Sequence, residues 1–279
     1  MIPGTEADRA AIEAFLRAHV AISMFPLSNL ARHGMAGGHG RAVRFWVKWQ
    51  AGALTDVLML TEGGLVFPCC PTAPWGDVRV VLSGRAIAGV LGDQRQVRPL
   101  RDALGLGNAA GLDVVEPHYH LPLADLRLPD CAGYDLVPIS QAQRALATAW
   151  REAYIRETLP MPGEDPAQKA LDDVTQFIAA DTHRLLLQAG VPVAMTGFNA
   201  RVPAAVQVGG VYTPPDLRGQ GHARRAVGLH LQEARQKGAH EAILFAANAP
   251  AARAYEALGF GHIGEFAVVI YQTPQVIHV

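Results

Sequence analysis

The chain has 279 residues, of which 50% are hydrophobic and 18% are charged, and its 24 basic and 25 acidic side chains leave a formal net charge of −1. This balance excludes a global electrostatic attraction to nucleic acid or to an anionic membrane surface. Three cysteines (Cys69, Cys70 and Cys131) are too few for a disulfide framework in so long a chain. No apolar run approaches the roughly 20 residues that cross a bilayer, and no signal peptide is evident. We therefore expect a cytoplasmic protein.

The length suggests two domains of roughly 150 residues each. Residues 128–134 carry turn formers and separate two stretches, each of which has the content of a complete α/β unit. We predict a first domain over residues 1–132 and a second over residues 133–279.

In the first half, apolar residues at helical spacing alternate with short β-rich runs. The patterns predict a helix over residues 6–19, a shorter helical piece around 25–30, strands over 42–50, 54–60, 63–67 and 86–91, and a helix over 94–104.

The second half repeats this order with stronger signals. The patterns predict helices over residues 140–158 and 166–180, strands over 183–188, 192–199 and 204–212, a helix over 220–237, a strand over 241–246, a helix over 250–258 and a last strand over 262–271. Gly238 follows the helix over 220–237, where a C-terminal cap is expected.

The most informative segment joins the strand over 204–212 to the helix that follows it. Two prolines end the strand, and Gly219 and Gly221 then open the helix. Successive backbone amides in this turn point into one concavity at a helix N-terminus, an arrangement that binds phosphate without a lysine. Three arginines (Arg218, Arg224 and Arg225) add positive charge. An ordinary strand–turn–helix connection with solvated arginines is the alternative.

Two motifs here resemble those of a known family. The run from Arg218 to Ala223 matches the Arg/Gln-x-x-Gly-x-Gly/Ala signature that binds pyrophosphate in the GNAT superfamily of acyl-CoA-dependent N-acyltransferases. Asn248, followed seven residues later by Tyr255 and then by Gly259-Phe260, resembles the second motif of that family. The resemblance covers roughly residues 136–271. It implies an α/β fold with a mixed, mostly antiparallel central sheet flanked by helices.

The resemblance also implies an activity, an N-acetyltransferase that uses acetyl-CoA as co-substrate. The residues it assigns to cofactor binding are Val211, Tyr212, Thr213, Arg218, Gly219, Gln220, Gly221, His222, Ala223, Arg224 and Asn248. The paired Gly209-Gly210 suggests a bulge that splays the strand from its neighbour and admits the thioester. Asn248 would contact the pantetheine arm or cap the next helix.

Tyr255 is the candidate catalytic residue, since its hydroxyl would protonate the departing thiolate. The alternative is an aromatic side chain packed on the inner face of its helix with Ala251 and Leu258. A primary amine must lose a proton before it attacks, yet the strand over 204–212 contains no Glu or Asp to act as base. Glu152 and Glu157 are candidates for contact with the acceptor, or else belong to a solvated helix face.

The first half resembles the front half of a bacterial two-domain GNAT subgroup in its segment 25–30, followed by the Phe45-Trp46 strand. We interpret it as a degenerate GNAT-like domain in which the turn at residues 89–93 lacks the pyrophosphate pattern. An unrelated α/β lid is the alternative. His118 and His120 form a possible metal pair, but no third ligand follows at a recognisable spacing, and we predict no metal.

The acceptor is not specified by any residue pattern. We expect a small-molecule or peptide amine and no nucleic-acid or membrane partner, with a monomer or a homodimer as the state in solution. A non-catalytic module that senses acyl-CoA and a tandem-GNAT transferase of aminoacyl or other acyl groups remain alternatives.

Overall fold

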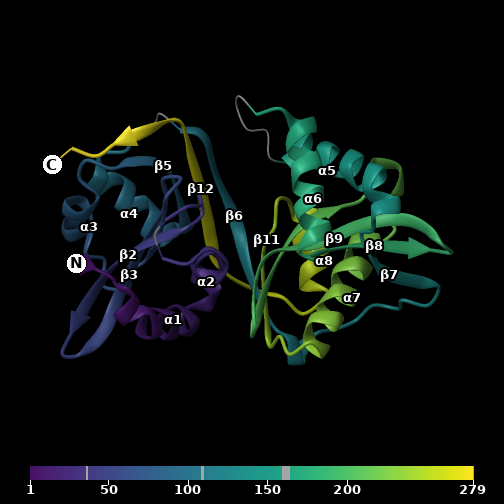
Figure 1. Cartoon of the computed structure of the whole chain (residues 1–279). Helices are drawn as coiled ribbons and strands as arrows, with labels where there is room; N and C mark the ends of the chain where they lie inside the picture. The colour runs from purple at the N-terminus through teal and green to yellow at the C-terminus, as the bar shows by residue number, and fades with distance from the viewer. Residues whose placement is uncertain (36, 108–109, 159–163, 279) are drawn as a thin grey trace. The chain divides into compact units, whose positions relative to one another are not determined.

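The computed structural model describes residues 1–35, 37–107, 110–158 and 164–278, and the chain forms two compact units (Figure 1). Unit 1 contains Met1–Glu116 and Gly264–Val279, and unit 2 contains Pro117–Ile263. The division therefore differs from a boundary after residue 132 in two places, because the final segment of the chain joins unit 1 and residues 117–132 join unit 2.

Unit 1 has α1 to α4 and a sheet in the order β1-β2-β3-β4-β5-β12, with the first part of β6 at its edge. Its elements are β1 (Ile2–Pro3), α1 (Arg9–Ala18), α2 (Val20–His33), β2 (Val43–Gln50), β3 (Ala53–Thr61), β4 (Leu65–Cys69), α3 (Trp75–Leu82), β5 (Ala86–Asp93), α4 (Gln94–Leu104), β6 (Ala110–Pro122) and β12 (Gly261–Val276). Val97, Leu100 and Leu104 of α4 are buried, as their helical spacing predicts. The predicted strands and the helix over 94–104 are confirmed, whereas β1, α3 and β6 were not predicted.

Unit 2 has a sheet in the order β6-β11-β10-β9-β8-β7, in which β10 and β11 are parallel and the pairs β6–β11, β10–β9, β9–β8 and β8–β7 are antiparallel. Its other elements are β7 (Tyr134–Pro138), α5 (Arg144–Thr158), α6 (Pro166–Ala179), β8 (His183–Gln188), β9 (Val191–Val202), β10 (Ala205–Tyr212), α7 (His222–Gln236), β11 (Glu241–Phe245) and α8 (Ala249–Glu256). The expected α/β fold with a mixed, mostly antiparallel sheet flanked by helices is confirmed.

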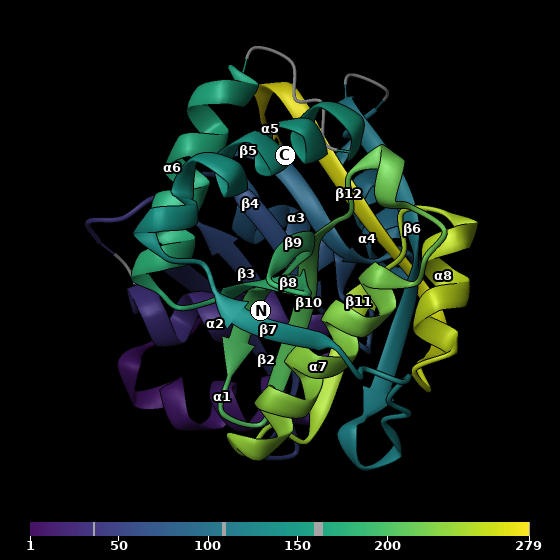
Figure 2. The ribbon, with the colours of Figure 1, turned by 90° about the vertical axis from the view of Figure 1, so that its right-hand side faces the viewer.

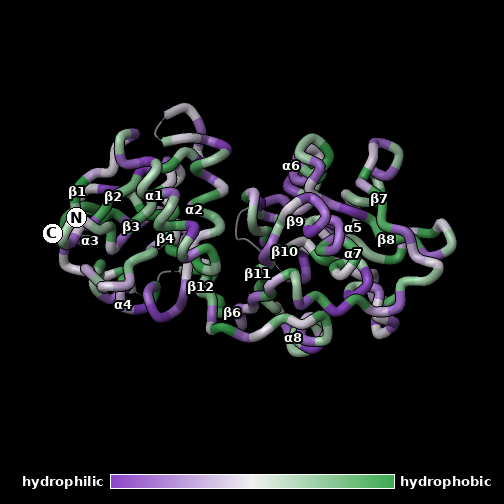
Figure 3. The backbone as a smooth tube through the Cα atoms, turned by 90° about the horizontal axis from the view of Figure 1, so that it is seen from below, coloured by the Kyte–Doolittle hydropathy of each residue, from purple (hydrophilic) through white to green (hydrophobic). Residues whose placement is uncertain are grey.

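The sheet of unit 2 is buried on both faces because its strands carry apolar residues on both sides. Leu185 of β8 packs with α5 and α6, whereas its neighbour Leu186 packs against Ala226 of α7. Figures 1 and 2 show α5 and α6 on one face and α7 and α8 on the other. Along the chain, hydrophobic and hydrophilic stretches alternate in both units (Figure 3).

The last strand of each half of the sequence pairs with strands of the other half. β12 pairs with β5 in unit 1, where Val269 lies opposite Val90, and β6 pairs with β11 in unit 2, where His120 lies opposite Ile243. The strand predicted over 262–271 is therefore present, but it completes the sheet of unit 1. No described helix combines the length and the apolar character needed to cross a membrane.

The interpretation of residues 89–93 as a turn in place of the phosphate loop is wrong, because these residues lie inside β5. In unit 2 the glycine-rich turn follows β10, which pairs antiparallel with β9 and parallel with β11. The strand with the same pairings in unit 1 is β4, so the corresponding turn is 70–74. That turn contains no glycine, and the buried carboxylate of Asp56 accepts hydrogen bonds from the Thr72 amide (2.8 Å) and hydroxyl (2.6 Å).

Candidate active site

A cavity of about 440 Å³ lies in unit 2 between the end of β10, the start of α7 and the helices α5 and α8. The predicted site residues that line it are Val211, Tyr212, Thr213, Arg218, Gly219, Gly221, His222, Ala223, Arg224, Asn248 and Tyr255. Gln220 is the one predicted residue that does not line the cavity. Its carbonyl oxygen instead accepts a hydrogen bond from Arg225 Nη1 (2.8 Å).

One wall of the cavity is formed by a bulge in β10. Between Gly209 and Tyr212, β10 advances three residues while β9 advances two, from Gly197 to Met195. The register of β10 with the parallel strand β11 ends at Val208. The bulge predicted at this glycine pair is confirmed, and it lies where β10 and β11 cease to pair.

Glycine is required in the bulge because neighbouring side chains fill the space beside it. A methyl group at Gly209 would overlap the side chain of Asn199, and one at Gly210, whose φ is +64°, would lie 2.9 Å from Nε2 of His183. The ring of His183 is fully buried, which lowers its pKa well below the usual range, and so the imidazole is neutral.

The turn before α7 has the geometry of an anion cradle. Gly219 and Gly221 both have positive φ angles (+79° and +76°), and Gly221 is the N-cap of α7. The amide of Arg225 donates to the carbonyl of Gly221 (3.1 Å). This is the first backbone hydrogen bond within α7. The amides of residues 222–224 lie in the first turn, where the helix offers them no carbonyl acceptor, so they are free to bind a ligand anion.

Two arginines beside the cradle have different surroundings. Arg225 donates to the carbonyl oxygens of Asp130 and Gln220 (2.8 Å each) and so braces the turn from outside the cavity. Arg224 lines the cavity, and its buried Nε has no hydrogen-bond partner among the residues that the structure describes. Arg224 is therefore the cation most available to a phosphate group.

Arg218 forms a two-pronged ion pair with Glu157 of α5, with distances of 2.9 and 2.7 Å, and also donates to the carbonyl of Thr213 (2.9 Å). The hydrogen bonds with Glu157 raise the pKa of Arg218. Glu157 is the one carboxylate among the described residues of the cavity wall. Glu152, the other predicted candidate for acceptor contact, does not line the cavity and is paired with Arg156 (2.7 Å).

Asn248 and Tyr255 are both placed by α8. Oδ1 of Asn248 accepts a hydrogen bond from the amide of Ala251 (2.9 Å), so this side chain caps the helix. Tyr255 is 7% exposed, packs with Leu258 and makes an edge contact with Phe260 at 6.2 Å between ring centroids. The same tyrosine also lines the cavity. Tyr255 therefore packs against its neighbours and is in contact with the cavity at the same time.

Sequence reasoning missed the cavity residues Tyr154 and Thr158 at the end of α5, and Phe245 at the end of β11. Their helical or strand spacing gave no sign that they face a cavity. Nε2 of His120, one of the two histidines considered for a metal, donates a hydrogen bond to the carboxylate of Glu241 (2.8 Å). Within the described ranges, no group of three or more His, Cys, Asp or Glu is arranged to hold a metal ion.

Residues 144–260 match the model of the family described as "Acetyltransferase (GNAT) family". This segment is a GNAT acetyltransferase domain. The domain is therefore an acyltransferase, and enzymes of this family transfer the acyl group from acyl-CoA. No curated protein matches the chain.

Solved structures extend the likeness beyond the GNAT domain. A GCN5-related N-acetyltransferase from Kribbella flavida is 19% identical, with a TM-score of 0.58 over 91% of this chain and 95% of its own. A GNAT-family acetyltransferase from Colwellia psychrerythraea is 12% identical, with a TM-score of 0.53 over 93% and 97%. A tandem GNAT protein from the clavulanic acid biosynthesis pathway is 15% identical, with a TM-score of 0.54 over 98% and 97%. At these identities the likeness shows a shared fold that includes both halves of the chain.

Proposed function

We propose that unit 2 is an N-acetyltransferase that moves an acetyl group from acetyl-CoA to a primary amine of a small molecule or peptide. The observation that carries this proposal is one cavity in which the glycine cradle of α7, the bulge of β10 and the hydroxyl-bearing Tyr255 meet. In this proposal the cradle binds the pyrophosphate, the bulge admits the thioester, and Tyr255 protonates the departing sulfur.

The residues present fit acetyl-CoA. The amides at 222–224 and the cation of Arg224 match a pyrophosphate, because helix N-termini and guanidinium groups both favour anions. Thr213 also lines the cavity, and its buried Oγ1 has no partner among the described residues. The last residue of β10 that pairs with β11 is Val208. The backbone of Val211 and Thr213 lies beyond it and can therefore form hydrogen bonds with the pantetheine arm, as it would with an added β-strand.

Acetyl-CoA, when bound, supplies the acetyl group as a thioester. In the proposed reaction, the neutral amine attacks the carbonyl carbon, the carbon–sulfur bond breaks, and Tyr255 donates its hydroxyl proton to the departing sulfur. The nitrogen that has become bonded to the acetyl group then loses a proton, which restores the hydroxyl of Tyr255. Holding the amine and the thioester in one cavity provides much of the rate acceleration. Glu157 is the carboxylate on the cavity wall that could bind a cationic amine. The amine would compete with Arg218 for this carboxylate.

We further propose that unit 1 is a degenerate GNAT-like domain without an acyl-CoA site. The turn 70–74 has no glycine, and Asp56 places a carboxylate where a phosphate would need to lie. A buried carboxylate repels a second anion, so this turn is unsuited to pyrophosphate.

A second candidate function is an acyl-CoA sensor that acetylates nothing. It is favoured by β10, which carries no Glu or Asp to deprotonate an amine. A tandem-GNAT transferase of aminoacyl or other acyl groups is a third candidate, and the likeness in fold to a tandem GNAT protein is consistent with it. The cytoplasmic location and the monomeric or homodimeric state stay predictions.

Release of free coenzyme A thiol should be measured with acetyl-CoA and a panel of amines, including amino acids, polyamines, aminoglycosides and peptides. We expect at least one amine to raise thiol release above the hydrolysis background and to appear as its acetylated product by mass spectrometry. If acetyl-CoA binds tightly but no amine raises thiol release above the background, the sensor function is favoured. Turnover only with a longer or aminoacyl donor would favour the third candidate.

A further inference from the structure

Unit 2 contains a second cavity, of about 390 Å³, at the opposite end of α7 from the glycine cradle. It is bounded by β8, β9, β10 and the last turns of α7, and it shares no lining residue with the acyl-CoA cavity. Its volume lies within the range of about 300–1,000 Å³ that is typical of small-molecule sites. None of the chemistry proposed above uses it.

The inner wall of this cavity is formed by apolar side chains and two stacked rings. The rings of Phe198 and His230 stack at 3.8 Å between centroids with an interplanar angle of 20°. Val206 and Ala234 extend the apolar wall on the strand side and on the helix side. Such a surface favours a planar aromatic group, which gains both burial and stacking.

His230 brings an unsatisfied polar atom to this wall. Its side chain is 2% exposed, and Nδ1 has no hydrogen-bond partner among the described residues. Burial lowers the pKa of His230 to about 3, so the ring is neutral at physiological pH. A buried polar atom without a partner costs free energy, which a ligand with a hydrogen-bonding group would recover.

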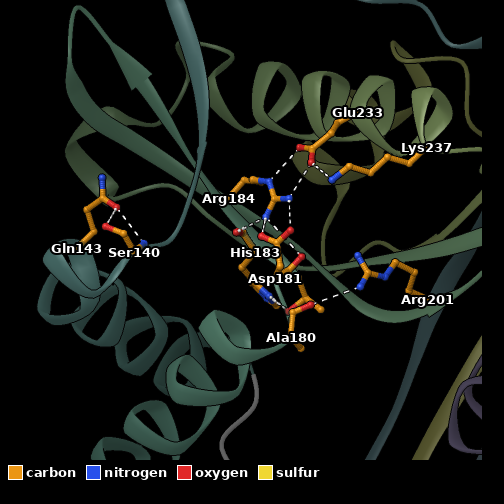
Figure 4. Close-up of polar contacts among 10 residues, drawn as sticks. Ser140, Gln143, Ala180, Asp181, His183, Arg184, Arg201, Glu233 and Lys237 are labelled. Atoms are coloured by element: carbon orange, nitrogen blue, oxygen red, sulfur yellow. Dashed lines mark hydrogen bonds and ion pairs between the residues drawn. The ribbon is translucent and has the colours of Figure 1, made fainter. Parts of the chain in front are cut away.

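Three cations and one carboxylate line this cavity: Arg184, Arg201, Lys237 and Glu233. Figure 4 shows their contacts. Arg184 is held by Glu233 (2.7 Å) and Asp181 (2.6 Å), and Lys237 also contacts Glu233 (2.5 Å). These bonds, led by that of Arg184, lower the pKa of Glu233 to about 2, so this carboxylate is ionised and already neutralised. It adds no net repulsion toward an incoming anion.

Arg201 differs from the other two cations because it has no carboxylate partner among the described residues (Figure 4). Its Nη2 donates one long hydrogen bond, of 3.4 Å, to the carbonyl of Ala180. A guanidinium that has no ion pair and lies beside an apolar cavity favours a ligand with a planar anionic group.

We propose that this cavity is a second small-molecule site and that it binds an aromatic carboxylate. The ring lies along the wall formed by Phe198 and His230, and the carboxylate pairs with Arg201. Because the two cavities share no residues, this site is independent of acetyl-CoA binding and of the proposed function.

The 279-residue chain should be titrated with 2-naphthoate by calorimetry, both without and with coenzyme A. We expect one site with a dissociation constant of roughly 0.1 mM, which is reasonable for a ligand of this size. Coenzyme A should not displace it. The neutral analogue 2-naphthalenemethanol should bind several-fold more weakly.

Two variants locate the bound probe. Arg201→Gln should raise the dissociation constant of 2-naphthoate roughly fivefold, because an exposed ion pair contributes little more than this to binding. The dissociation constant of the neutral alcohol should not change. Val202→Trp, at a partly buried position on the cavity wall, should abolish binding of both compounds. Arg253→Gln on α8 and Val191→Trp, at a 62% exposed position on β9, are the matched controls and should bind both compounds normally.

Three results would overturn the proposal. The first is no binding of 2-naphthoate at millimolar concentration, and the second is its displacement by coenzyme A, which would place it in the other cavity. The third is unchanged affinity in both Arg201→Gln and Val202→Trp. If either variant fails to fold, as judged by circular dichroism, the other still decides the location.

Discussion

Replacing Gly221 with valine is expected to weaken acetyl-CoA binding by at least about 100-fold, which corresponds to the loss of two charge-assisted hydrogen bonds. Gly221 has a φ of +76°, which a β-branched residue adopts only with strain. A Cβ atom at this position would also lie 2.9 Å from Nη1 of Arg225, the side chain that braces the turn. The substitution therefore distorts the amides that face the cavity, and calorimetric titration measures the result.

The matched control is Gly238→Val, which places the same side chain at a positive φ of +96° beyond the other end of α7. A Cβ atom at Gly238 meets nothing within 4 Å. This variant should lose some stability through backbone strain but retain its affinity for acetyl-CoA. Equal affinities in the wild type and in Gly221→Val would show that the cofactor does not bind at the cradle.

Replacing Tyr255 with phenylalanine is expected to lower kcat by about 10- to 1,000-fold, a range that overlaps the lower part of the roughly 100- to 10,000-fold contribution typical of general acid–base catalysis. The lower part of that range is expected because a thiolate with a solution pKa near ~8.5 is only a moderately poor leaving group. The dissociation constant of acetyl-CoA should barely change, since the ring and its packing against Leu258 and Phe260 remain. The loss should be larger for weakly nucleophilic amines.

Tyr154→Phe provides the comparison, because Tyr154 lines the same cavity from α5. Steady-state kinetics of the two variants with one amine should show a large loss of kcat only for Tyr255→Phe. If Tyr255→Phe keeps full activity, Tyr255 has a packing role, and water supplies the proton. If Tyr154→Phe shows the larger loss, Tyr154 is the acid.

The glycine cradle could be predicted from the sequence because its signals are local. Pro214 and Pro215 end a strand, Gly219 and Gly221 permit positive φ angles, and the apolar spacing of a helix begins directly afterwards. The bulge at Gly209 was predictable for the same reason, since paired glycines inside a strand weaken its regular pairing.

Features that depend on distant parts of the chain could not be predicted in this way. Glu157 and Arg218 are 61 residues apart, and each alone resembles a solvated surface charge. The pairing of Val269 with Val90 is decided by competition among whole strands, which a local pattern does not encode. The helix α3 was missed because Gly76 and three valines within it are unfavourable for helices.

Hydrogen–deuterium exchange with and without acetyl-CoA locates the acyl-CoA site directly. We expect slower exchange in peptides that cover residues 208–224, where the bulge and the cradle lie, and unchanged exchange in peptides that cover residues 70–82 of unit 1. If exchange instead slows at residues 70–82 and stays unchanged at residues 208–224, acetyl-CoA binds to unit 1 and not at the cradle.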